Sequence, residues 1–147
     1  MPDPFAPLAR PIPVTVTSTP VAGTTADGIA VLRLLRPSHD HALGTECAAC
    51  AAQTDIRALL FDLLQSARQG HRPPFTRVVV DASALPDVAA VTDRLVPGKM
   101  PALGLRDHTV ARSFVLHGAA DHRQLVDQPK QPAGRKLEPA TSSAPRR

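Results

Sequence analysis

Apolar and polar residues alternate along residues 12–17, which read IPVTVT. A period of two predicts a β-strand with one face on a core, and Pro13 is tolerated because it lies at the strand's first positions. Residues 77–81, RVVVD, are typical of a central parallel strand, and residues 112–119 are a third strand candidate. The apolar run at 29–35 fits either a helix or a buried strand, because periodicity does not separate the two at this length.

The clearest helical pattern is a stripe of apolar residues at helical spacing. Its members are Ile56, Leu59, Leu60, Leu63, Leu64 and Ala67. Thr54 is the predicted N-cap, Asp55 suits the positive end of the helix dipole, and Gly70 suits a left-handed cap. A second helix is predicted over 88–95, whereas 36–53 and 97–108 are predicted to be irregular. We expect the leucine stripe to face the core.

Strands and helices alternate in this order, which predicts an α/β fold with right-handed crossovers. Ligand sites in such sheets lie at the carboxyl ends of the strands, so the loop at 18–28 and Asp81 should meet there. Prolines crowd both ends of the chain. We therefore expect a disordered start over 1–11, one domain over 12–121, and a disordered, basic tail over 122–147.

Composition narrows the choice of partners. The chain has 147 residues, 3% aromatic residues and a net charge of +4. Much of the positive charge lies in the tail and is not interleaved with aromatic residues, so no nucleic-acid partner is expected. No apolar stretch reaches the length of a membrane span, and the start lacks a secretory apolar segment. A cytoplasmic protein without a membrane partner is the resulting expectation.

The two cysteines, Cys47 and Cys50, are three residues apart. In a cytoplasmic protein such a pair indicates thiols or metal ligands, with His39, His41 and Glu46 close enough in sequence to complete a site for zinc, cobalt or nickel. The alternative is a loop with two ordinary thiols. A redox pair is the less favoured interpretation, because the cysteines are not predicted to lie between a strand and a helix start.

Four segments in order resemble the CobW-type metal-chaperone GTPases. IPVTVTSTPVAGTTADG at 12–28 is similar to the family's first strand and phosphate loop, and CAAC at 47–50 to its CxCC metal motif. VVVDASALPDV at 78–88 and VARSFVLHGAAD at 110–121 are similar to two later family segments. The resemblance implies a truncated, P-loop-NTPase-like parallel sheet with flanking helices.

The resemblance also implies a function and its residues. GTP and Mg²⁺ would lie at Gly23, Thr24, Thr25, Asp81 and Ser83, and a metal ion would be carried to a metalloenzyme client.

The chain departs from the family where phosphates are held. A phosphate loop needs glycines and a lysine, yet Gly23 is the only glycine between 18 and 27 and no lysine precedes Lys99. A lost charged contact costs about 1.5–3 kcal/mol. We therefore expect no competent GTP hydrolysis, with metal binding as the property that remains.

Two alternatives stay open. One is a non-enzymatic metal-binding or interaction module. The other is a non-functional gene fragment, which the polar tail after residue 121 favours.

Overall fold

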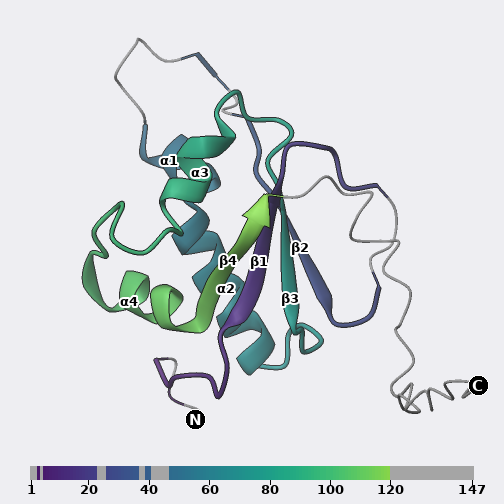
Figure 1. Ribbon diagram of the computed structural model, residues 1–147, viewed down its shortest axis with the longest axis vertical. Coiled ribbons are helices and arrows are strands. Elements are labelled where there is room, and N and C mark those ends of the chain that lie inside the picture. Colours follow the sequence, from purple (N-terminus) through teal and green to yellow (C-terminus); the bar gives the residue numbers. More distant parts are fainter. Residues whose placement is uncertain (1–2, 4, 23–25, 37–38, 41–46, 120–147) are drawn as a thin grey trace, which may run out of the picture.

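The structure, a computed structural model, describes residues 3, 5–22, 26–36, 39–40 and 47–119. Four strands and four helices follow one another in this part of the chain (Figure 1). In chain order they are β1 (Ile12–Thr17), β2 (Ile29–Arg33), α1 (Ala48–Thr54), α2 (Ile56–Arg68), β3 (Arg77–Asp81), α3 (Val88–Asp93), α4 (Gly104–Ser113) and β4 (Phe114–Ala119).

All four strands are parallel and form one sheet in the order β2-β3-β1-β4. The predicted α/β class is therefore confirmed. The ambiguous segment at 29–35 is a strand, because Ala30 pairs with Val78 and Leu32 with Val80 on β3. Since β3 lies directly beside β1, Asp81 pairs with Thr17, so the loop after β1 starts next to Asp81.

The core lies where the strands meet the helix layer. Figure 1 shows the helices gathered on one side of the sheet, with α1 and α3 toward the end to which the strands run. The buried apolar residues of this layer include Val14, Val16, Val78, Val80, Leu60, Leu63 and Leu64. Each such side chain contributes about 1.5–3 kcal/mol by leaving water. The predicted leucine stripe of α2 therefore faces the core.

The ends of α2 differ in part from the prediction. Asp55, not Thr54, is the N-cap, and its carboxylate accepts hydrogen bonds from the N–H groups of Arg57 and Ala58. Thr54 is instead the last residue of α1, where its hydroxyl donates to the Cys50 carbonyl. Gly70 has a φ of +74°, which confirms the left-handed cap.

Two segments predicted to be irregular contain helices. α1 occupies Ala48–Thr54, almost all of it in the predicted loop at 36–53. The alanine-rich sequence AACAAQT has a high helix propensity despite its lack of periodicity. α4 starts at Gly104 within the predicted loop at 97–108. Its buried residues are mainly polar, with Asp107, Thr109 and Ser113 beside Val110, so no apolar stripe marks it in the sequence.

Residues 5–11, which we expected to lack structure, pack against the fold. The ring of Phe5 stacks on Phe61 with centroids 6.0 Å apart, and Leu8 contacts the core. The Arg68 guanidinium donates to the carbonyl of Ala6. The predicted disordered tail at 122–147 lies outside the described residues.

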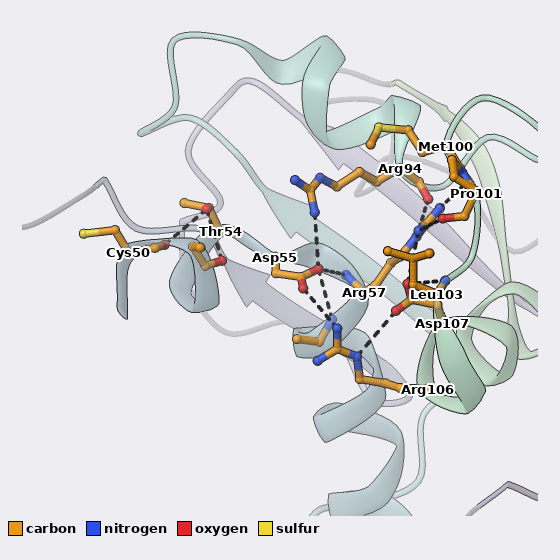
Figure 2. A network of polar contacts seen from close by, with 12 residues as sticks. Cys50, Thr54, Asp55, Arg57, Arg94, Met100, Pro101, Leu103, Arg106 and Asp107 are labelled. Atoms are coloured by element: carbon orange, nitrogen blue, oxygen red, sulfur yellow. Dashed lines mark hydrogen bonds and ion pairs between the residues drawn. The ribbon is translucent and has the colours of Figure 1, made fainter. Parts of the chain in front are cut away.

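A buried guanidinium joins α2 to the segment that precedes α4 (Figure 2). Only 12% of the Arg57 side chain is exposed. It donates to the carbonyls of Arg94, Met100 and Pro101 at 2.7–2.9 Å, and Nη1 lies 3.3 Å from Oδ2 of Asp107. Asp107 also accepts from the Leu103 N–H. Burying these charges costs little because both have several partners.

We predict that Arg57→Ala lowers the free energy of unfolding by about 3 kcal/mol, because it leaves the Asp107 carboxylate and three carbonyls short of a donor. Chemical denaturation monitored by circular dichroism measures this loss. The control is Lys99→Ala, which breaks an exposed ion pair with Asp93 and should cost less than about 0.5 kcal/mol. Equal losses in the two variants would contradict the structural role of Arg57.

Candidate metal centre

His39, Cys47 and Cys50 bring three metal-ligating atoms together. The Nε2 atom of His39 lies 3.3 Å from Sγ of Cys47 and 3.8 Å from Sγ of Cys50. All three atoms are within 4.8 Å of one another. Among the described residues, these three form a group that could hold a metal ion, and all three are ligands that the sequence predicted.

The start of α1 positions both cysteines. Cys47 is the N-cap, with extended backbone at φ −79° and ψ 152°, and Cys50 follows in the first turn. A separation of three residues places both side chains on the same side of this turn. Cys50 is 2% exposed, whereas Cys47 is half-buried and His39 is exposed. The group of three is thus buried at Cys50 and open to solvent at His39.

These separations suit a tetrahedral ion. With Zn–S near 2.3 Å and Zn–N near 2.0–2.1 Å, tetrahedral angles put a bound nitrogen and sulfur about 3.6 Å apart. The two His39–cysteine distances, 3.3 and 3.8 Å, lie on either side of that value. Sulfur and imidazole ligands favour zinc, and cobalt accepts the same set. Only small side-chain movements are needed for these three atoms to hold such an ion.

The Cys47 thiol is already disposed to ionise. The Cys50 backbone amide, followed by the Cys50 thiol, lowers the pKa of Cys47 to about 7, with smaller contributions from His39 and the Ala49 amide, while desolvation opposes them. A thiol with this pKa is about half thiolate at neutral pH. The thiolate is the form that binds metals.

Asp81 uses its carboxylate to hold its own chain. It is 5% exposed. The Ser83 hydroxyl and N–H donate to Oδ1 at 2.6 and 3.0 Å, and the Val21 N–H donates to Oδ2 at 3.0 Å. Nε of Arg33 lies 3.7 Å from the same Oδ2. The carboxylate thus stabilises the turn that follows β3.

The start of the loop after β1 is held by the same contacts. Val21 donates its N–H to Asp81, and its carbonyl accepts from the Arg33 guanidinium at 2.9 Å. Thr17 and Thr19 form a local turn, in which the Thr19 N–H donates to the Thr17 hydroxyl at 3.0 Å. Both backbone polar groups of Val21 therefore already have partners within the chain.

Several predicted site residues fall outside the described part of the chain. Gly23, Thr24 and Thr25 of the expected phosphate loop are among them, as are the candidate ligands His41 and Glu46. Their roles stay predictions. Ser83, the remaining candidate, serves Asp81 through the two hydrogen bonds described above.

Sequence reasoning missed the residues that hold the cysteine helix in place. Asp55 closes α1 by donating its N–H to the Ala51 carbonyl, and its carboxylate lies 3.7 Å from Arg94 and 3.4 Å from Arg106. The available signal was an aspartate before a strong apolar stripe, which also fits an N-cap. Nothing in the apolar pattern indicated its two arginine partners.

Comparison of the chain with known protein families, with curated proteins and with solved structures found no match. Within the described ranges, each helix is too short or too polar to span a bilayer.

Acid should destabilise the fold through Asp81. Burial raises the pKa of this carboxyl, but the hydrogen bonds of Ser83 and Val21 and the charge of Arg33 outweigh burial and hold the pKa below its ordinary value. Since the folded pKa lies below the unfolded value of about 3.9, the stabilisation is complete above that pH and is lost as pH falls through the folded pKa.

We therefore predict that the contribution of Asp81 to the free energy of unfolding decreases progressively below about pH 4. Asp81→Asn should lower stability at pH 7 by about 1–3 kcal/mol and flatten the acid decline. Urea denaturation across pH 7 to 3 measures both effects. Asp62→Asn, a change to an exposed residue of α2, is the control. An Asp81→Asn variant with the parent's acid profile would refute the assignment.

Proposed function

We propose that the protein binds a divalent transition metal ion, Zn²⁺ or Co²⁺, through His39, Cys47 and Cys50. We further propose that it handles this ion as a CobW-like metal-trafficking protein without competent GTP hydrolysis. The observation that carries the metal site is the approach of three ligand atoms to within 4.8 Å of one another. The trafficking role rests on the resemblance of four ordered segments to the CobW-type family.

The ligand number supports transfer of the ion over permanent storage. Structural zinc sites have four protein ligands, whereas three ligands leave a coordination position for water or an incoming group. Among the described residues the group has three members, and its histidine is exposed. The fourth position would be filled by water, by a predicted ligand such as His41, or by a ligand of a metalloenzyme client that draws the ion away.

The position of the site also separates metal binding from folding. The core consists of the strands and the apolar stripe of α2, and only Cys50 of the three ligands is buried. Loss of the ion should consequently leave the sheet intact. This differs from small zinc domains, which unfold without their metal.

The nucleotide part of the family function is not proposed for this chain. No lysine is present before Lys99 to neutralise the phosphates. The Asp81 carboxylate, which would act on Mg²⁺, is occupied by donors of its own chain. The backbone of Val21 is turned toward Arg33 and Asp81. These contacts support a protein that handles metal without GTP.

Cobalt titration tests the metal site. We predict that the reduced protein binds one Co²⁺ with thiolate-to-cobalt charge-transfer absorption, and that Zn²⁺ displaces it because zinc binds such ligands more tightly. Cys47→Ser and His39→Ala should each weaken binding at least about tenfold, which equals about 1.4 kcal/mol.

The matched control is His71→Ala, which removes an exposed histidine outside the cluster. It should bind Co²⁺ like the parent. Circular dichroism of each variant shows whether the fold persists. Cobalt binding that is unchanged in Cys47→Ser would exclude the proposed site.

Nucleotide titration tests the second half of the proposal. We predict that a fluorescent GTP analogue with Mg²⁺ binds with a Kd above about 1 mM, corresponding to less than about 4.1 kcal/mol of binding free energy. The reason is that no cationic side chain is available in the loop after β1. Isothermal calorimetry provides an independent measurement. Submillimolar binding by either method would overturn this conclusion.

A further inference from the structure

The two cysteines of the metal group also meet the requirements of a dithiol pair. Neither forms a disulfide in the structure. Their sulfur atoms are within 4.8 Å of each other, and they belong to one turn at the start of α1. The sequence disfavoured a redox pair because the cysteines were not predicted to lie between a strand and a helix start. The structure places a helix start there, since α1 begins directly after Cys47.

The two sulfurs differ in access. Cys47 is half-buried and stands at the exposed His39 side of the group, whereas Cys50 is 2% exposed. Thiol–disulfide exchange requires one thiol that reaches an external disulfide and a second thiol that resolves the mixed disulfide. Cys47 and Cys50 suit these roles in that order, because only the first is open to a second molecule.

We propose that Cys47 and Cys50 form a thiol–disulfide couple whose oxidation by a low-molecular-mass disulfide excludes the metal ion from the same site. This regulation rests on the proposed metal-binding function. The dithiol state binds the ion through its thiolates together with His39. The disulfide state has neither thiolate, and His39 alone among the three is left as a ligand.

The reaction balances without any other reactant. The Cys47 thiol gives its proton to solvent, and the resulting thiolate attacks one sulfur of R–S–S–R, forms a mixed disulfide and expels R–S⁻, which takes a proton from solvent. The Cys50 thiol gives its proton to solvent and attacks Sγ of Cys47, and the second R–S⁻ leaves and is protonated. The protein loses two electrons and two protons, and the small disulfide gains them as two thiols.

Geometry makes the two states mutually exclusive. Sulfurs that bind one tetrahedral ion stay about 3.8 Å apart, whereas bonded sulfurs are about 2.0 Å apart. Moreover, the thiolate is the metal ligand, and a disulfide has no thiolate to offer. Oxidation therefore releases the ion, and a bound ion in turn occupies both sulfurs and slows their attack on a disulfide.

Intact mass spectrometry tests the couple. The chain has only two cysteines, so a monomer that loses two hydrogens carries the Cys47–Cys50 disulfide. We expect this loss when the reduced, metal-free protein meets hydroxyethyl disulfide. Cys50→Ser should instead accumulate the mixed disulfide at Cys47. Cys47→Ser should react at least about tenfold more slowly, because Cys50 is buried.

The cobalt-loaded protein tests the exclusion. Under the same reagent we expect one Co²⁺ to be released to a chromogenic chelator for each disulfide formed. His39→Ala separates the two chemistries, because it keeps both thiols. It should still form the Cys47–Cys50 disulfide, whereas it binds cobalt more weakly.

Failure of this inference differs from failure of the metal site. If cobalt binds but the metal-free thiols persist in excess disulfide, the couple is refuted and the metal function stands. Cobalt that remains bound to oxidised protein also refutes the exclusion. If the reduced protein does not bind cobalt, the proposed function fails at the titration, before any disulfide is added.

Discussion

The Asp55 carboxylate is the contact on which the placement of the metal group depends. One residue separates the helix that carries the cysteines from the helix that fills the core. Asp55 ends α1 through its N–H, starts α2 through its carboxylate, and meets Arg94 and Arg106. Thr54 closes the same turn by donating to the Cys50 carbonyl. The cysteine turn is thereby fixed to α2, a helix of the core. Of its own side chains, Cys50 is buried.

The apolar pattern of the sequence predicted the main strands and the longest helix, but it did not predict the elements whose buried residues are polar. β1 and α2 have patterns with one dominant period, and β3 is the continuous apolar run of a strand that is buried on both faces. α4 was missed because its buried residues are chiefly polar. Specific partners stabilise such residues in the interior, as Arg57 does for Asp107. Such pairs join residues fifty positions apart, and no local pattern records them. α1 was not predicted because its alanine-rich sequence has no stripe of large apolar residues.

The candidate site was predicted in its chemistry and not in its geometry. Ligand type and spacing identified Cys47, Cys50 and His39, since few residue types bind zinc or cobalt. The unequal burial of the two cysteines depends on α1, a helix that the sequence analysis did not predict. It placed the N-cap of α2 one residue too early, at Thr54. Asp81 shows the converse case. Its position after a strand suggested a magnesium ligand, but its bonds to Ser83 and Val21 depend on a turn that sequence spacing does not describe.

Asp81 and Cys47 differ in how far partners within the chain already occupy the group that would bind a metal ion. At Asp81, donors from Ser83, Val21 and Arg33 neutralise the carboxylate from within the chain, so an external cation would have to displace contacts that already stabilise the fold. At Cys47 the neighbouring amides stabilise a thiolate without consuming its capacity to bind a metal. An exposed histidine faces it. A divalent transition-metal ion would therefore meet less competition at the cysteine turn than at the strand end, which agrees with the metal function proposed above.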